Sequence, residues 1–131
     1  MAIEYKVETD NPGNKSNLLI DFDYVIHDNV TGWKAADYID GKPVDGAFDK
    51  LKEYHQYFNV CIFSIRNFQE GGIEAMKKWF ISHNFDPSML SFPTTKLPGY
   101  TLDAKCNCFN GVFPTVNNIK QFRNWKGCKG L

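Results

Sequence analysis

Short apolar runs alternate with amphipathic stretches over most of this chain. Continuous hydrophobic runs are typical of strands in a sheet that is covered on both faces. Turn-forming residues such as Asn, Asp, Gly and Pro separate the runs. The runs that predict strands are 17–22, 59–63, 89–92, 100–103 and, just before an Asn-Gly turn signal, 106–109.

Apolar residues also recur at steps of three and four, the spacing of one helical face. This spacing predicts a first helix from Ala47 to about Phe58, a second over 72–82, and a third after Thr115, whose hydroxyl can cap it. Their inward faces would carry Ala47, Phe48, Leu51, Tyr54 and Phe58; Ile73, Met76, Trp79 and Phe80; and Val116, Ile119, Phe122 and Trp125. Because strands and helices alternate, we expect an α/β fold, a Rossmann-like, doubly wound and mainly parallel sheet with helices on both faces.

The length of 131 residues fits one domain and leaves no room for a separate cap domain. Residues 1–16 are polar and predict a loosely held N-terminal arm, 17–127 would form the single domain, and 128–131 a short tail. Within the domain, 27–45 shows little periodicity and contains several turn formers. A loop of this length in a compact domain is usually functional, so we expect a flap over the site.

Positive and negative side chains are balanced, with 15 Lys plus Arg and 15 Asp plus Glu. This balance gives no long-range attraction to nucleic acid or to an anionic membrane, and the scattered basic residues support nucleic-acid binding only weakly. No run approaches the length of a transmembrane helix, and the start of the sequence lacks the apolar core of a signal peptide. We therefore expect a cytoplasmic protein with no membrane association and no obligatory protein partner.

The four cysteines could be reduced structural thiols or metal ligands. Cys106 and Cys108 are separated by one residue where zinc sites usually have two or more, and no second pair lies at a suitable distance. Cys61 falls inside an apolar run. Cys128 could be exposed, but nothing around it indicates a reactive thiol. Reduced structural thiols are the favoured interpretation.

Two carboxylates, Asp21 and Asp23, end the first apolar run. In an extended chain, residues two apart point the same way, so both could face one small volume beyond the carboxyl end of the strand. Open α/β sheets bind ligands at that place. Carboxylates this close repel each other unless a cation such as Mg²⁺ lies between them or one is protonated. The alternative is that both are turn or helix-capping residues.

Three further polar residues lie at or near the ends of other predicted strands. Ser64 ends the second run, Lys96 precedes the run at 100–103, and Asp103 closes that run. Asp-x-Asp, Ser, Lys and Asp in this order resemble the four signatures of the haloacid dehalogenase-like superfamily of phosphohydrolases, most closely a small capless branch found in bacteria and phages. The resemblance covers roughly 17–126 and includes three longer strings: Gly32-Trp33-Lys34, Gly71-Gly72-Ile73-Glu74-Ala75-Met76 and Phe92-Pro93-Thr94-Thr95-Lys96.

The resemblance implies a role for each matched residue. Asp21 would be the nucleophile that forms an aspartyl-phosphate, and Asp23 would be the general acid and base. Ser64 and Lys96 would bind the transferring phosphoryl group, and Lys96 would also offset the charge of Asp21. Mg²⁺ would be held by the Asp21 side chain, the backbone carbonyl of Asp23 and Asp103.

Other residues have two interpretations each. Trp33 and Lys34, in the expected flap, are candidates for substrate contact, although Trp33 could instead pin the flap to the body of the domain. Arg66 has a guanidinium group suited to phosphate, but it could equally pair with Glu70 or another acid. His27 is a candidate for substrate contact, and a lone histidine is more often structural.

Two positions depart from the pattern of the superfamily. The fourth motif reads Asp103-Ala104-Lys105 where relatives commonly have two adjacent acids, and Tyr24 stands where a glycine commonly follows Asp-x-Asp. If the metal-binding acid corresponds to Ala104, metal affinity falls; if it corresponds to Asp103, little is lost.

The leading hypothesis is a Mg²⁺-dependent phosphatase acting on a phosphomonoester, with small molecules, nucleotides and nucleic-acid ends all open as substrates. The alternative is a catalytically impaired module of the same fold that binds phosphate or a partner.

Overall fold

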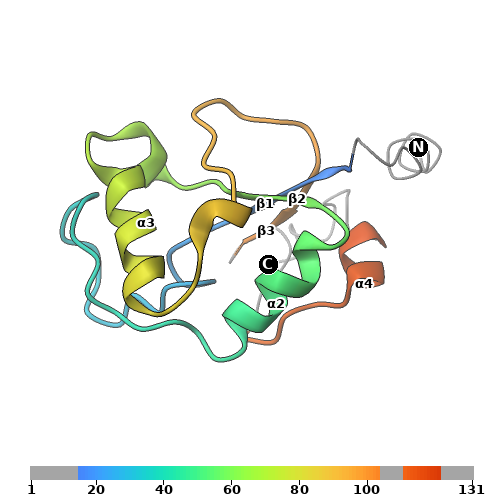
Figure 1. Ribbon diagram of the computed structural model, residues 1–131, viewed down its shortest axis with the longest axis horizontal. Coiled ribbons are helices and arrows are strands. Elements are labelled where there is room, and N and C mark those ends of the chain that lie inside the picture. Colours follow the sequence, from blue (N-terminus) through green and yellow to red (C-terminus); the bar gives the residue numbers. More distant parts are fainter. Residues whose placement is uncertain (1–14, 104–110, 122–131) are drawn as a thin grey trace, which may run out of the picture.

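The computed structural model describes residues 15–103 and 111–121, and its centre is a three-stranded parallel sheet (Figure 1). The strands are β1 (Asn17–Ile20), β2 (Asn59–Ile62) and β3 (Tyr100–Leu102), in the spatial order β2-β1-β3. All three run in the same direction, so their carboxyl ends meet at one edge of the sheet. This arrangement confirms the predicted α/β fold class with a parallel sheet.

Three α-helices are described: α2 (Ala47–His55), α3 (Gly72–Ser82) and α4 (Val116–Gln121). Two short 3₁₀ helices, η1 (Ile65–Phe68) and η2 (Pro87–Met89), follow β2 and α3. The bounds of α3 agree with the helix predicted from the sequence. In the described part of the chain, none of the helices has the length and apolar character needed to cross a membrane.

The ends of α2 and α4 show how local contacts set helix length. The helix α2 stops at His55, short of the predicted end, yet the Phe58 N–H still bonds to the Tyr54 carbonyl at 2.8 Å and its side chain is buried. Phe58 therefore reaches the core from the turn that leads into β2. Thr115 caps α4 as predicted, because its Oγ1 accepts a hydrogen bond from the Asn118 N–H at 3.1 Å.

One hydrophobic core joins the helices to a single face of the sheet. Residues paired across neighbouring parallel strands share a face, and the paired residues in this core are Leu18, Ile20, Val60, Ile62, Tyr100 and Leu102. The helices contribute Ala47, Leu51 and Tyr54 from α2, Met76, Trp79 and Phe80 from α3, and Ile119 from α4. All three described α-helices thus pack on one face, where the sequence predicted helices on both.

The opposite face of the sheet carries Leu19 and Cys61, which are buried but do not belong to that core. Side chains from η1 and β1 hydrogen-bond to the Pro93 and Pro98 carbonyls at 2.8 and 3.0 Å, which ties down the segment 92–99. In Figure 1 this segment passes on the other side of the strands from α2 and α4. Among the described residues, an irregular segment therefore lies on this side of the strands.

The predicted strand at 89–92 is reduced to a single bridge. Ser91 pairs in parallel with Cys61, its N–H bonds to the Val60 carbonyl at 2.9 Å, and its carbonyl accepts the Ile62 N–H at 2.8 Å. The pairing stops there because η2 comes directly before and Pro93, which has no N–H to donate, follows.

Parts of the predicted architecture lie outside the described residues. These are most of the N-terminal arm, the strand at 106–109, the tail at 128–131, and the individual residues Ala104, Lys105, Cys106, Cys108, Phe122, Trp125 and Cys128.

Cys61 is a buried free thiol, and burial raises its pKa. A buried thiol of this kind is unreactive, which agrees with the structural role predicted for it.

Candidate functional site

The carboxyl ends of the strands bring three predicted site residues to one edge of the sheet. Asp21 directly follows β1, Asp103 directly follows β3, and Ser64 lies two residues past β2. The backbone pairing continues beyond the strands, because the Asp21 N–H donates to the Leu102 carbonyl at 3.0 Å and the Phe63 N–H donates to the last carbonyl of β1 at 2.9 Å. Asp21 therefore lies between the residues that follow its two neighbouring strands.

Asp21 and Asp103 bring two carboxylate residues to the same edge of the sheet. They stand one residue beyond the paired Ile20 and Leu102, and both are partly buried. Mg²⁺ is commonly held by one or two carboxylates together with waters and substrate phosphate oxygens. The donor set at this edge fits that pattern. Within 15–103 and 111–121, no group of three or more His, Cys, Asp or Glu side chains could hold a metal ion by itself.

Ser64 is fixed at the start of η1. Its Oγ accepts a hydrogen bond from the Arg66 N–H at 3.1 Å, and its carbonyl accepts the Asn67 N–H at 2.9 Å, so the residue caps the 3₁₀ turn. The side chain is buried. Because this bond uses the oxygen as an acceptor, the hydroxyl proton can be donated to a phosphoryl oxygen, as the resemblance implies.

The Asp23 carboxylate is bound by Arg66 and His27. Arg66 Nε donates to Oδ2 and Nη2 donates to Oδ1, each at 3.0 Å, and His27 Nδ1 lies 2.9 Å from Oδ1. The Asp23 side chain is 15% exposed and that of Arg66 only 1%. A bidentate pair of guanidinium and carboxylate is a strong, directional contact. Arg66 thus pairs with an acid, and that acid is Asp23 and not Glu70.

These contacts lower the pKa of Asp23. Burial by itself would raise that pKa, but the hydrogen bonds from His27 and Arg66, together with the charge of Arg66, outweigh burial. A general acid must carry a proton at the working pH. The general-acid role that the resemblance implies for Asp23 stays a prediction.

His27 is a buried structural residue with both ring nitrogens bonded. The Gly41 N–H donates to Nε2 at 2.9 Å, so Nε2 is an acceptor and the ring proton is on Nδ1, which donates to Asp23. The ring stacks on Phe22 and meets Trp79 edge-on. Only 1% of the His27 side chain is exposed, so it holds the Asp23 carboxylate as a buried partner. The structural interpretation fits this geometry better than substrate contact.

The other side of Arg66 holds the expected flap. Its Nη1 donates to the carbonyls of Ala35 and Ala36 at 2.8 and 2.9 Å and approaches that of Tyr38 at 3.4 Å. The Trp33 ring lies over the guanidinium, with its centroid 4.4 Å from Cζ. A cation is attracted to an aromatic face, so Trp33 packs the flap onto the body of the domain. We name the Asp23, Arg66 and His27 side chains with these flap carbonyls the flap clasp.

The two predicted lysines make different contacts. Lys34 Nζ lies 3.3 Å from Asp40 Oδ2 and from the Thr31 carbonyl, and its side chain is 43% exposed. Lys96 is exposed on the segment 92–99, and its amine makes no hydrogen bond or ion pair with any residue that the structure describes. The described contacts place neither lysine against Asp21.

Tyr24 has an unusual backbone conformation at the edge of the site. Its φ of 73° is left-handed, a conformation that glycine adopts freely and other residues at a cost of about 1–2 kcal/mol. Its N–H donates to the His27 carbonyl at 2.7 Å, and 56% of its side chain is exposed. The turn after Asp23 therefore contains a tyrosine in a strained, left-handed conformation.

Comparison of Tyr24→Gly with Tyr24→Ala separates the effect of backbone strain on stability from the effect of losing the tyrosine ring. We expect the Tyr24→Gly protein to be more stable than the Tyr24→Ala protein by about 1 kcal/mol, because only glycine relieves the left-handed strain. Urea unfolding of both proteins measures the difference. Equal stabilities would show that the left-handed turn is not required.

Asn67 is a buried residue that the sequence motifs did not single out. Its Nδ2 donates to the Ile62 carbonyl at 2.7 Å and to the Pro93 carbonyl at 2.8 Å, so it links β2 to the segment 92–99. Its Oδ1 is buried and has no hydrogen-bond partner among the described residues. The only signal in the sequence was a polar residue shortly after a strand, which is more often exposed.

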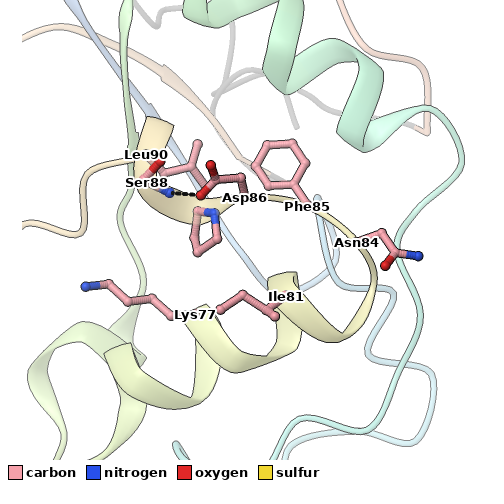
Figure 2. A pocket seen from close by; sticks show the side chains of 8 residues that line it. Lys77, Ile81, Asn84, Phe85, Asp86, Ser88 and Leu90 are labelled. Atoms are coloured by element: carbon pink, nitrogen blue, oxygen red, sulfur yellow. Dashed lines mark hydrogen bonds between the residues drawn. The ribbon is translucent and has the colours of Figure 1, made fainter.

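A pocket of about 690 Å³ lies between α3 and η2, apart from the strand ends. Figure 2 shows Lys77 and Ile81 extending from α3 across from the η2 segment, where Asp86 Oδ1 accepts the Ser88 N–H at 3.0 Å. None of the predicted site residues contributes to this pocket, whose lining is Lys77, Ile81, Asn84, Phe85, Asp86, Pro87, Ser88 and Leu90. The candidate site is thus at the edge of the sheet and not in this cavity.

No family model, curated protein or solved structure matches this chain. The resemblance to the haloacid dehalogenase-like superfamily therefore stays a prediction.

Proposed function

We propose that this protein is a Mg²⁺-dependent phosphohydrolase of the haloacid dehalogenase-like type, which removes a phosphoryl group from a phosphorylated substrate. The observation that carries the proposal is the position of Asp21 between Asp103 and Ser64, at the carboxyl edge of three adjacent parallel strands. Ligands of open α/β sheets bind at this edge. The three strands would be the centre of a doubly wound, Rossmann-like domain without a cap.

The residues at the edge would divide the chemistry between them. Asp21 would attack phosphorus through a carboxylate oxygen, and water would hydrolyse the aspartyl-phosphate that results. Ser64 would donate its hydroxyl proton in a hydrogen bond to a phosphoryl oxygen. Mg²⁺, held by Asp21 and Asp103, would offset the negative charge that otherwise keeps carboxylate and phosphate apart. Lys96 is predicted to be a second cation, besides Mg²⁺, that offsets the negative charge of the carboxylate and the phosphate.

The Asp21→Asn substitution tests the nucleophile. We expect release of inorganic phosphate from 4-nitrophenyl phosphate, with Mg²⁺ present, to fall by more than about 10³-fold, because the covalent path is removed. Asp45→Asn is the matched control, since Asp45 is an exposed carboxylate in the turn before α2, and this variant should keep the wild-type rate. Equal rates in the wild-type and Asp21→Asn proteins would rule out Asp21 as the nucleophile.

A second function, phosphate binding without turnover, is favoured by one observation. Both oxygens of Asp23 are occupied by Arg66, which leaves the site without its expected acid. Calorimetric titration with Mg²⁺ and then beryllofluoride, which mimics a phosphoryl group on a carboxylate, separates the two functions. Binding of beryllofluoride that is lost in Asp21→Asn supports the phosphohydrolase, whereas binding of inorganic phosphate alone supports the module without turnover.

A further inference from the structure

We infer that exposed aromatic side chains beside the candidate site stack on a nucleobase, so that the substrate is a phosphorylated nucleotide unit. A free nucleotide and the 5′ end of a single strand both carry such a unit. The inference rests on the proposed function and narrows its substrate class. It is carried by three exposed residues next to the site, Tyr24, Trp33 and Ile65, which are 56%, 46% and 61% exposed.

The Trp33 ring is held at the site by one of its faces. Its centroid lies 4.4 Å from Cζ of Arg66, so the guanidinium covers one face of the indole. Arg66 is itself fixed by two hydrogen bonds to the Asp23 carboxylate, which keeps the ring beside that carboxylate. Nearly half of Trp33 is still exposed, although a buried arginine lies against it. A ring placed in this way can stack a planar group on its other face.

Tyr24 combines a large exposed ring with a strained backbone. Its φ of 73° is left-handed, which is uncommon for a residue other than glycine. Its ring makes no hydrogen bond, ring contact or cation contact with any residue that the structure describes. Packing in the described part of the protein therefore does not account for the aromatic ring. Strained residues cluster at ligand-binding sites, and Tyr24 lies three residues after Asp21, the proposed nucleophile.

Ile65 adds an apolar side chain next to the residue that would bind the phosphoryl group. It directly follows Ser64 and is the first residue of η1. Ser64 is fixed there, because its Oγ accepts the Arg66 N–H at 3.1 Å. A substrate whose phosphate reached Ser64 would therefore have an apolar surface beside its leaving group.

These side chains favour a planar, uncharged ring in the leaving group. Exposed aromatic side chains bind nucleobases by stacking, and every base has a face that can stack. Stacking of one base is worth about 5- to 100-fold in affinity. The balance of 15 basic and 15 acidic residues gives no strongly basic surface for a long strand. Recognition would therefore be confined to the nucleotide that carries the phosphate.

The test compares two phosphate esters of the same sugar. Adenosine 5′-monophosphate and ribose 5-phosphate share the same primary leaving oxygen and differ in the presence of the base. With the wild-type protein and Mg²⁺, we expect kcat/KM for adenosine 5′-monophosphate to be higher by at least about 10-fold. A 5′-phosphorylated oligoadenylate separates the two sources of the nucleotide: kcat/KM at least equal to that of adenosine 5′-monophosphate supports strand ends, and a lower value supports free nucleotides.

Substitutions assign the preference to particular rings. The ratio of the two kcat/KM values is compared within each protein, which cancels any loss that affects both substrates. We expect Tyr24→Leu and Trp33→Leu each to lower this ratio by about 10-fold, whereas Tyr24→Phe retains the ring and should retain the ratio. Tyr57→Leu is the matched control, because Tyr57 is 49% exposed but precedes β2, at the opposite edge of the sheet.

The outcomes separate this inference from the proposed function. Equal kcat/KM for the two sugar phosphates, or a ratio that neither leucine variant at Tyr24 or Trp33 changes, overturns the inference and leaves the phosphohydrolase standing. Absence of phosphate release from both of them and from 4-nitrophenyl phosphate overturns the proposed function. Calorimetric titration of the wild-type protein then decides the inference alone: adenosine 5′-monophosphate that binds at least 10-fold more tightly than ribose 5-phosphate supports a nucleotide ligand, and equal binding overturns it.

Discussion

Replacement of Arg66 by Met is expected to lower the free energy of unfolding by about 3–5 kcal/mol. The Asp23 carboxylate would stay buried with only His27 as a partner, and the carbonyls of Ala35 and Ala36 would lose their donor. Removal of one partner from a buried ion pair costs far more than the net value of the pair, because the remaining charge is left unsolvated. Urea unfolding of the variant and wild-type proteins measures the change.

Two variants control this experiment. Lys34→Met also removes a cation from an ion pair, but Lys34 and Asp40 lie at the surface, with 43% and 29% of their side chains exposed, so stability should barely change. Arg66→Lys keeps the charge and loses the planar fork, so it should fall between Arg66→Met and wild type. If Arg66→Met were no less stable than Lys34→Met, the flap clasp would contribute nothing to folding.

The pH dependence of stability is a second way to measure the interaction between Asp23 and Arg66. The folded state lowers the pKa of Asp23 below its unfolded value, which is about 3.9. The stability that this shift contributes is therefore present above the unfolded pKa and is lost as the pH falls through the folded pKa. We expect the wild-type protein to lose stability more steeply than Arg66→Met on acidification from pH 5. Parallel curves for the two proteins would contradict the assignment to Asp23.

The substitution Gly72→Ala is expected to destabilise the protein by about 3 kcal/mol. Gly72 is the first residue of α3, and a Cβ there would overlap the backbone carbonyl of Arg66 in η1. A backbone atom cannot move aside as the end of a flexible side chain can, so α3 would have to shift from η1. Because η1 also carries Ser64 at its cap, the same shift would disturb the candidate site.

Gly46→Ala is the matched control for that experiment. Gly46 directly precedes α2, whereas Gly72 is the first residue of α3. Unlike Gly72, Gly46 has a left-handed φ of 81°, and a Cβ there would meet nothing within 4 Å. Its substitution should cost only the backbone strain, about 1 kcal/mol. Thermal and urea unfolding of both variants compare the two effects. A Gly72→Ala protein as stable as Gly46→Ala would mean that α3 and η1 are not in close contact.

The sequence predicted the elements whose signals are local. The bounds of α3, the Thr115 cap and the three paired strands could be read from apolar spacing and turn formers, because these signals lie within one element. The placement of Asp21 and Asp103 at one edge followed from the same logic, since each ends an apolar run and parallel strands end together.

Spacing along the chain says less about the residues that follow the end of a strand. The strand β1 ends at Ile20 and the chain then turns, with the Ile26 N–H bonded to the Phe22 carbonyl at 2.9 Å, so Asp21 and Asp23 both lie beyond the paired strand. The rule that residues two apart share a direction holds only in a strand. A buried strand likewise does not show what covers it, so the helices on both faces of the sheet stay a prediction.

By itself, then, the sequence determined that a parallel sheet would present two acids and a serine at one edge, because strand ends are marked by the chain's own hydrophobic pattern. Only the tertiary structure decided which charges are paired. Asp23 and Arg66 are 43 residues apart, and no periodicity relates them. Ion pairing depends on distance and burial in the folded chain, which bring Arg66 and His27 onto the Asp23 carboxylate.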